Sequence, residues 1–438
     1  MREETADFPA GKACCPECQL PYLPASGTQD ADYTEIEVQA YTRRVKRKRY
    51  RPGCQCTTLS GIIVAPMPPR LLPRNDLGVA IWVDVLLDKY LYARATNRLL
   101  QEYQSYGLTI APGTICGGLK KLAPMFEPLY AAFHAKQMTE SLFYGDETRW
   151  SVFETVAGKT GHRWWLWVVI SDAVTYYYMA PTRGAVHPEK HFADLNEATL
   201  MAIFMCDRLS SYKKMAKGIA VLILAFCWAH VRRDFIKAAR SYPDEQTWMF
   251  DWVERIGNLY HLNHQRCDLW DADKSLPQQS EAFTEPHQAL KQSLASMAQE
   301  RDDYLAQKDL AAPRRSVLTS LKNHWDGLTI FLDHPVVKMD NNISERAARK
   351  GAIGRNNYYG SGSVWSGHLA AMMFTLLQTL QQWGINPRHW MTAFLNACAQ
   401  NGGQAPADLN PFLPWEMNAE RKAFLSQPLP TEPPPDTS

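Results

Sequence analysis

The sequence lacks three features that would have narrowed the function at once. No run of about 18 or more apolar residues occurs, so a membrane-spanning helix is not expected. The first residues, MREETADFPAGKACC, do not have the basic-then-apolar pattern of a secretory signal peptide, and we therefore expect a cytoplasmic protein. The formal net charge is only +2, so total charge does not identify a nucleic-acid binder. Any surface that binds nucleic acid must therefore come from a local cluster of basic residues.

Cysteine and apolar residues are well represented. The chain has ten cysteines, and in a reducing cytoplasm closely spaced cysteines are read first as metal ligands. At 438 residues and 46% hydrophobic composition, the chain can bury a sizeable core and is long enough for roughly two or three domains.

The hydrophobic pattern in the middle of the chain is typical of strands. Three consecutive runs rich in aromatic and β-branched residues, SLFYGDETRWSVFE, HRWWLWVVISD and AVTYYYMAPTRG, predict neighbouring antiparallel strands. A helix near 188–197, a strand at 199–207, a short helix near 211–217 and a strand at 221–228 are expected to follow. The last two strands are apolar on both faces, as in central strands covered by helices. The order βββαβαβ predicts a mixed α/β sheet with helices on its faces.

Most of the remaining sequence predicts helix. Residues 76–140 have apolar positions recurring at three and four, with 111–137 read as a helix pair. Residues 229–335 are expected to be almost wholly helical. The segment 351–367 is rich in glycine and asparagine and predicts a loop. The apolar helix after it ends at Gly384, and its Met and Phe side chains are expected in the core.

Three acidic residues stand in separate, well-marked settings. Asp146 in FYGDETRW and Asp207 in MAIFMCDRLSSY each close a strand-like run, and Glu345 in KMDNNISERAARK opens an arginine-rich helix. Phosphodiester chemistry can use two Mg²⁺ or Mn²⁺ ions about 3.5–4 Å apart, held by carboxylates. We expect Asp146 and Asp207 to bridge two such ions and Glu345 to complete the shell of the second.

Each acid also has an ordinary structural interpretation. Asp146 could begin a turn, and Asp207 could cap the helix that follows it. Glu345 would fall at the third position of a helix capped by Asn342, which forms a capping box, and Arg349 could pair with it. The joint placement of the three acids, in a sheet order that can bring them together, favours the metal site.

Two close cysteine pairs lie in the N-terminal region, Cys15 and Cys18 in CPEC, and Cys54 and Cys56 in CQC. Four thiolates can hold one structural Zn²⁺ in a tetrahedral site. A segment this small has little core of its own, and the binding energy of the metal would fold it. The alternative is a set of free thiols in a loosely folded segment.

A basic run, TRRVKRKRYR (42–51), lies between the two cysteine pairs, and Lys and Arg fill seven of its last nine positions. Such a run neutralises phosphates and makes binding depend on salt. More basic residues follow Glu345. The candidate DNA-binding residues are Arg43, Arg44, Lys46, Arg47, Lys48, Arg49, Arg349, Lys350 and Arg355.

Two further residues are candidates for a supporting role. In CWAHVRR, Cys227 and His230 stand at a strand–helix junction, where they could bind a metal or His230 could approach the scissile phosphate. A buried cysteine with a hydrogen-bonded histidine is the alternative. Arg346 follows Glu345 directly and could meet DNA phosphates.

Taken in order, these motifs resemble the transposases of the bacterial insertion sequence sixty-six family. The matching runs are GDETRW, CDRLSSY, CWAHVRRDF, DNNISERAARKGAIGRNNYYGSG and SGHLAAMMFTLLQT, and the likeness covers about 10–400. The resemblance implies an RNase H-like fold with an Asp-Asp-Glu (DDE) triad at Asp146, Asp207 and Glu345 and a helical insertion before the glutamate. It also implies a zinc-binding region where the cysteine pairs lie. Family members usually carry a longer region ahead of it.

With this resemblance, the expected organisation has six segments. These are a zinc-binding, DNA-contacting segment (1–65), a helical domain (66–140), the first part of an RNase H-like catalytic core (141–235), a helical insertion (236–335), the final part of the core with the Glu-bearing helix (336–384), and a C-terminal segment with a disordered tail (385–438).

The expected function is that of a transposase acting on double-stranded DNA. It would bind transposon ends, cut a strand with water, and pass the freed 3′-OH to target DNA. Holding two ends implies a homo-oligomer on DNA, and accessory transposition proteins could take part. One alternative is a zinc-ribbon DNA-binding protein without catalysis, including an inactive truncated copy. Another is a hydrolase that uses Asp146 with Glu147, or Glu345, as an acid–base pair and needs no metal.

Overall fold

The computed structural model describes residues 13–23, 31, 38–53, 61–195 and 201–429. The chain divides into two compact units, 1–43 and 44–438, which are taken separately below. In the first unit, an isolated antiparallel bridge joins Cys14 to Pro21 around a tight turn. The amide of Gln19 donates to the carbonyl of Cys15 at 2.9 Å and closes that turn.

The second unit begins with a small antiparallel ribbon. Strand β1 (Arg49–Tyr50) pairs with β2 (Ile63–Val64), and both strands are exposed to solvent. An isolated two-stranded ribbon is at best marginally stable in water, so this one has little packing of its own to hold it.

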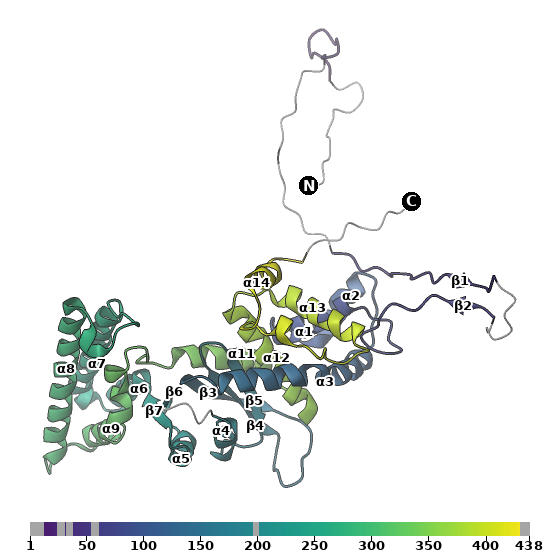
Figure 1. The fold of residues 1–438 in the computed structure, drawn as a ribbon. Helices are drawn as coiled ribbons and strands as arrows, with labels where there is room; N and C mark the ends of the chain where they lie inside the picture. Colours follow the sequence, from purple (N-terminus) through teal and green to yellow (C-terminus); the bar gives the residue numbers. More distant parts are fainter. Residues whose placement is uncertain (1–12, 24–30, 32–37, 54–60, 196–200, 430–438) are drawn as a thin grey trace. The chain divides into compact units, whose positions relative to one another are not determined.

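A five-stranded mixed sheet forms the centre of the second unit (Figure 1). Its strands, in the order β5-β4-β3-β6-β7, are β3 (Leu142–Ser151), β4 (Arg163–Ile170), β5 (Thr175–Ala180), β6 (Ala202–Cys206) and β7 (Leu222–Phe226). The first three are antiparallel neighbours, and β6 and β7 run parallel to β3. Helices α4 (Val186–His191) and α5 (Ser210–Gly218) connect β5 to β6 and β6 to β7. The predicted order βββαβαβ and the mixed sheet are confirmed, and the arrangement is compatible with an RNase H-like fold.

Helices cover both faces of the sheet. Figure 1 shows α11 and α12 on one face and α4 and α5 on the other. Besides α4 and α5, the α-helices outside the insertion are α1 (Val79–Tyr90), α2 (Thr96–Ser105), α3 (Pro112–Gln137), α11 (Asn342–Tyr358), α12 (Val364–Gln382), α13 (Pro387–Gln400) and α14 (Ala419–Ser426). The expected core role of α12 is confirmed, because Met372, Met373 and Phe374 are fully buried.

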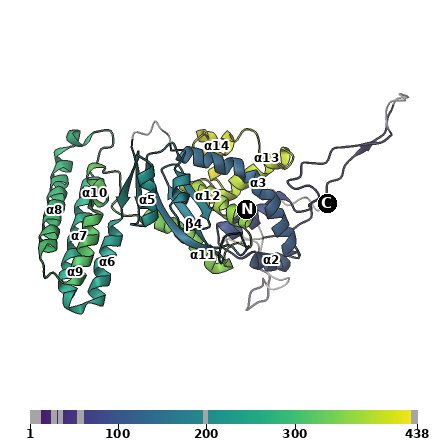
Figure 2. The ribbon, with the colours of Figure 1, turned by 90° about the horizontal axis from the view of Figure 1, so that it is seen from below.

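The predicted helical stretch between the sheet and Glu345 is also confirmed. It comprises α6 (Trp228–Ser241), α7 (Gln246–Cys267), α8 (Glu281–Ala306), α9 (Ala312–Asn323) and α10 (Trp325–Asp333). These helices gather beside β7, where α10 packs on the strand (Figures 1 and 2). Among the residues described, none of the helices is both long and apolar enough to cross a bilayer.

Two local predictions were wrong. Residues 111–137 form the single helix α3 although Pro124 and Pro128 lie inside it, and its continuous apolar face keeps it whole. The segment predicted as a loop at 351–367 is mostly helix, since α11 continues to Tyr358 and α12 already begins at Val364. Gly351 is there for close packing, because a Cβ at this position would lie 2.5 Å from Leu166 Cδ2 on the sheet.

Candidate active site

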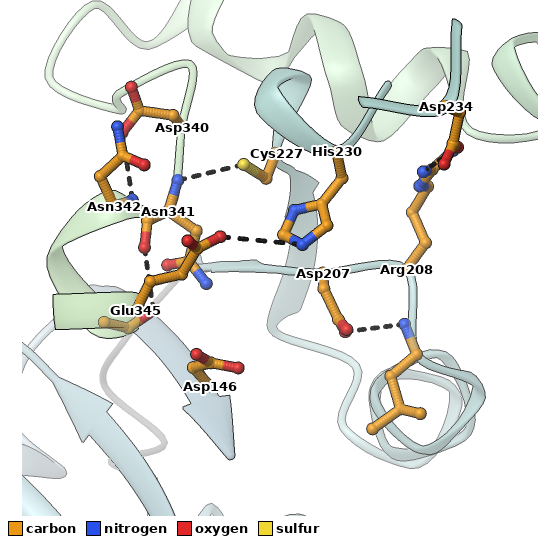
Figure 3. Close-up of polar contacts among 12 residues, drawn as sticks. Asp146, Asp207, Arg208, Cys227, His230, Asp234, Asp340, Asn341, Asn342 and Glu345 are labelled. Carbon is orange, nitrogen blue, oxygen red and sulfur yellow. Dashed lines mark hydrogen bonds and ion pairs between the residues drawn. The ribbon is translucent and has the colours of Figure 1, made fainter. Parts of the chain in front are cut away.

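The register between β3 and β6 brings two of the predicted acids level with each other. In this parallel pair Tyr144 lies beside Met205. Two residues further along each strand direction stand Asp146 and Asp207. Residues in register on neighbouring strands point to the same face, so this register, continued by two residues, brings Asp146 and Asp207 to the same part of the sheet. Figure 3 shows both near Glu345 and His230, with the Asp207 carboxylate turned to a backbone amide.

Asp146 does not end its strand, contrary to the sequence prediction. On one side, β4 pairs with β3 as far as Ser151, whereas the pairing with β6 stops at Tyr144. Asp146 therefore lies within a strand that is held on its β4 side. Asp207 does follow its strand directly, and its Oδ1 accepts a hydrogen bond from the amide of Leu209 at 2.9 Å, in the turn that leads into α5.

Asn341 fixes the start of the third element of the site. It is buried at 1% exposure, and its side-chain Nδ2 donates to the carbonyl of Gly145 at 2.7 Å. Its backbone amide donates to Cys227 Sγ at 3.3 Å. These two contacts attach the beginning of α11 both to β3, next to Asp146, and to the end of β7. The first turn of α11 consequently delivers Glu345 to the same cluster (Figure 3).

Glu345 does not form the capping box that the sequence suggested. The residue before α11 is Asn341, rather than Asn342, and its side chain makes no cap hydrogen bond. The Glu345 amide donates to the Asn341 carbonyl at 3.2 Å, which leaves the carboxylate for the site. Glu345 Oε1 lies 3.7 Å from Nε2 of His230, which sits in the first turn of α6.

Several carboxylates lie close together in the cluster and disfavour one another's ionisation. Burial raises the pKa of Asp146 to about 8, and the nearby carboxylates of Glu147, Asp207 and Glu345 push it in the same direction. The amide of Glu147, 2.9 Å from Asp146 Oδ1, opposes this rise but does not cancel it. Without a cation the cluster therefore holds the proton of Asp146 near neutral pH, and a divalent cation bound among the carboxylates would favour their ionised forms.

The donor set fits divalent cations of the magnesium type. Oxygen ligands from carboxylates are what Mg²⁺ and Mn²⁺ prefer. In the part of the chain that the structure describes, Glu345 Oε1, Asn341 Oδ1 and His230 Nδ1 are buried without a hydrogen-bond partner. A buried oxygen left without a partner is costly unless another group, such as a metal ion, satisfies it.

Glu147, next to Asp146, belongs to the other face of the sheet. Its side chain is buried, and it accepts hydrogen bonds from the Tyr212 hydroxyl at 2.5 Å and from Arg183 Nε at 2.8 Å. Tyr212 lies on α5, the helix that begins at Ser210, shortly after Asp207. Glu147 therefore ties β3 to the helix that follows Asp207. Both of its carboxylate oxygens are occupied, which argues against the predicted pairing of Asp146 with Glu147 as acid and base.

The basic candidates differ in their surroundings. Arg346, Arg349 and Lys350 are exposed on α11. Arg355, in contrast, donates from Nη1 to the carbonyl of Arg149 and thereby fastens α11 to β3. The basic run is exposed as well, with Arg43 at the end of the first unit and Arg44, Lys46, Arg47, Lys48 and Arg49 in the second.

Of the two N-terminal cysteine pairs, Cys15 and Cys18 lie among the described residues. Amide hydrogen bonds from Cys18 and Glu17 lower the pKa of the Cys15 thiol. This favours the thiolate, the form that binds zinc. Cys54 and Cys56 lie outside the described residues. The four-cysteine zinc site therefore stays a prediction.

The fold and the acidic cluster define the class of protein: an α/β protein in which acidic residues from a mixed sheet and from a later helix lie near one another. Comparison with known families identifies the family. A family model described as "Transposase IS66 family" matches residues 76–369. The chain belongs to this family, which confirms the resemblance drawn from the sequence and supports transposase function. The match runs from the helices before the sheet, through the helical insertion, into α12.

Similar proteins occur in Sinorhizobium fredii (strain NBRC 101917 / NGR234). The uncharacterized protein y4jD is 24% identical over 426 residues, which cover 94% of this chain and 80% of the relative. The uncharacterized protein y4hP is 23% identical and covers 95% of this chain and 75% of its own length. No solved structure matches the chain.

Proposed function

We propose that the protein is a DDE transposase that cleaves and joins DNA at Asp146, Asp207 and Glu345. The observation that supports the proposal is the β3–β6 register, which pairs Tyr144 with Met205, two residues before each aspartate, while α11 begins close by with Glu345 in its first turn. Family membership supports the same conclusion. Two Mg²⁺ or Mn²⁺ ions held there would activate the attacking oxygen and stabilise the leaving oxygen of a phosphodiester.

The three carboxylates have distinct tasks in this proposal. Asp146 and Asp207, from adjacent strands, would hold the divalent cations as a rigid pair of ligands. Glu345, from a helix on one face, would be the third carboxylate ligand. In the first step the oxygen of water bonds to phosphorus and the bond to the 3′ oxygen breaks, which frees a 3′-OH. In the second step that hydroxyl attacks a phosphodiester of target DNA, so one bond is exchanged for another.

His230 and Arg346 support this chemistry. Burial is the main cause of the lowered pKa of His230, so its ring is neutral near pH 7. A neutral imidazole 3.7 Å from Glu345 can orient the carboxylate through a small movement or through one water. Arg346 is exposed one position after Glu345, where its guanidinium can meet a phosphate of the bound strand.

DNA binding is assigned to the exposed basic residues. The run around β1 neutralises backbone phosphates, and Arg349 and Lys350 extend the contact from α11. Arg355 contributes by holding α11 against β3. One structural Zn²⁺ at Cys15, Cys18, Cys54 and Cys56 would organise the N-terminal segment. Two transposon ends would be held by a homo-oligomer, with accessory proteins as further partners.

The test is cleavage of a plasmid that carries the element's own ends, with Mg²⁺ present. The wild type should nick or cut at the ends, and Asp146→Asn and Asp207→Asn should each lose at least about 100-fold in rate while still shifting end DNA in a gel. Asp309→Asn, at an exposed turn of the helical insertion, is the matched control and should cut normally.

Three outcomes would contradict the proposal. End binding by the wild type without any cutting would favour the DNA-binding protein that lacks catalysis. Cutting that persists in EDTA would favour the metal-independent hydrolase. Equal cutting by Asp146→Asn and the wild type would remove Asp146 from the mechanism.

A further inference from the structure

A second set of possible metal ligands overlaps the acidic cluster. Cys227, His230 and Glu345 each present one ligand atom, and these three atoms lie within 4.8 Å of one another. Cys227 follows β7, where its amide donates to the carbonyl of Cys206 at 3.2 Å and prolongs the strand pairing. His230 stands one turn later on α6 (Figure 3). The end of β7 therefore positions Cys227, and the first turn of α6 positions His230.

The chemistry of this set differs from that of the three acids. A thiolate and an imidazole are ligands for Zn²⁺ and similar transition ions, whereas Mg²⁺ takes oxygen ligands. Cysteine, histidine and one carboxylate make three protein ligands with a fourth position left for water, which is a common zinc arrangement. Cys227, unlike Glu345 and His230, has no evident use in a purely Mg²⁺-dependent reaction.

The distances suit a tetrahedral ion. With zinc bonds of about 2.0–2.3 Å, neighbouring ligand atoms lie about 3.3–3.8 Å apart. His230 Nε2 and Glu345 Oε1 are already 3.7 Å apart. Since no pair in the set exceeds 4.8 Å, a movement of about 1 Å at the Cys227 side closes it.

Two features around the ligand atoms suit a metal ion, although burial raises the pKa of the Cys227 thiol. The amide of Asn341 donates to Cys227 Sγ at 3.3 Å, and a hydrogen bond of this kind stabilises a thiolate ligand. Glu345 Oε1 and His230 Nδ1 are buried and, in the described part of the chain, lack a hydrogen-bond partner. An ion at this position would satisfy the carboxylate oxygen directly.

We propose that Cys227, His230 and Glu345 form a binding site for one Zn²⁺ ion that is separate from the four-cysteine site, and that Zn²⁺ bound there inhibits DNA cleavage. Inhibition follows because Glu345 belongs to both sets. A carboxylate drawn towards Cys227 and His230 no longer completes the magnesium site with Asp146 and Asp207. The inhibitory effect rests on the proposed transposase function, whereas zinc binding itself does not.

Binding is tested first, without DNA or Mg²⁺, on the full-length protein with Co²⁺ as the probe. Thiolate coordination to Co²⁺ gives an intense charge-transfer absorption. The four-cysteine site would give it too, so the difference between the wild type and Cys227→Ser reports Cys227. The wild type should take up one equivalent of Co²⁺ more than Cys227→Ser. Cys116→Ser, which removes an exposed thiol of α3, is the matched control and should behave as the wild type.

A thermal melt and a second variant guard against a folding defect in Cys227→Ser. The serine can still accept the Asn341 hydrogen bond, so the melt of Cys227→Ser should match that of the wild type. His230→Gln keeps the thiol and should bind Co²⁺ at least about tenfold more weakly. Identical uptake and identical spectra for the wild type, Cys227→Ser and His230→Gln would overturn the site.

Inhibition is tested next, in plasmid cleavage at constant Mg²⁺ with increasing Zn²⁺. The wild type and Cys116→Ser should lose activity, whereas Cys227→Ser should keep its Mg²⁺-dependent cutting at the same Zn²⁺ concentration. Equal Zn²⁺ sensitivity of Cys227→Ser and the wild type would refute the regulatory part. If the wild type does not cut DNA at all, the transposase proposal fails, and the Co²⁺ titration still decides whether the zinc site exists.

Discussion

Replacing Asp146 with asparagine should stabilise the protein in the absence of divalent cations, although it removes a proposed metal ligand. The carboxylate is partly buried among Glu147, Asp207 and Glu345, and its pKa rises from 3.8 to about 8. Ionisation at this position therefore opposes folding. Asparagine has nearly the same shape and carries no charge, so it removes first the cost of burying a charge and also the repulsion from the neighbouring carboxylates.

The sign and range of the effect follow from linkage. Because the folded chain binds this proton more tightly than the unfolded chain, the stability it contributes is complete below pH 3.8 and is lost as the pH rises to about 8. The advantage of Asp146→Asn should therefore be small near pH 4, grow between pH 4 and pH 8, and stay constant above.

The magnitude can be bounded. A pKa difference of about 4 corresponds to about 6 kcal/mol at most. Asp146 keeps partial contact with solvent, which screens the repulsion, so we expect about 2–3 kcal/mol. With an unfolding entropy of about 2.1 cal/mol/K per residue, this free energy raises the Tm of a chain of this length by about 3 °C.

Thermal melts in EDTA from pH 5 to pH 9 measure the effect, with the exposed Asp309→Asn as control. Added Mg²⁺ should raise the Tm of the wild type at pH 8 and leave that of Asp146→Asn nearly unchanged, because binding of a ligand to the folded state stabilises it. A Tm advantage that does not grow with pH, or a loss of Tm in Asp146→Asn at pH 9, would refute the account of a crowded carboxylate cluster.

Three further changes test other parts of the structure. Tyr212→Phe removes a hydrogen bond to the buried carboxylate of Glu147 and should cost about 1.5–3 kcal/mol in urea unfolding, and a cost below about 0.5 kcal/mol would contradict that role. Gly145→Ala would place a Cβ 2.2 Å from Phe204 Cζ, so its unfolding free energy should fall by about 1–3 kcal/mol, whereas a neutral effect would show that this part of the sheet is loosely packed. Lys46→Ala should weaken end binding and reduce the slope of log affinity against log salt by about 1, and an unchanged slope would exclude a phosphate contact there.

Much of the fold was predictable because its signals are local. The change from helical to strand periodicity, the βββαβαβ order and the fully apolar β6 and β7 are visible in short windows of sequence. The same windows place Asp207 directly after a buried strand. Short windows mispredict the segment around Gly351. A glycine that permits a helix to pack closely on Leu166 cannot be distinguished, from local sequence, from a glycine in a loop.

The composition of the site depends on contacts between distant segments. Whether Asp146 is level with Asp207 is decided by the hydrogen-bond register of β3 and β6, and a shift of one residue would turn one carboxylate to the opposite face. Asn341 lies in a run that carries the family resemblance, but the sequence did not indicate its role, in which its side chain and amide join α11 to β3 and to Cys227.

The sequence by itself determined which residues could act as acids, where each lies along a strand or helix, and that the chain resembles a transposase, because these properties reside in residue type and short-range pattern. Only the tertiary structure decided that Glu345 returns across the helical insertion to Asp146, that Glu147 faces away, and that Cys227 and His230 share the Glu345 carboxylate. The physical reason is that such convergence is fixed by strand register and by buried contacts between segments far apart in the chain, which no short stretch of sequence encodes.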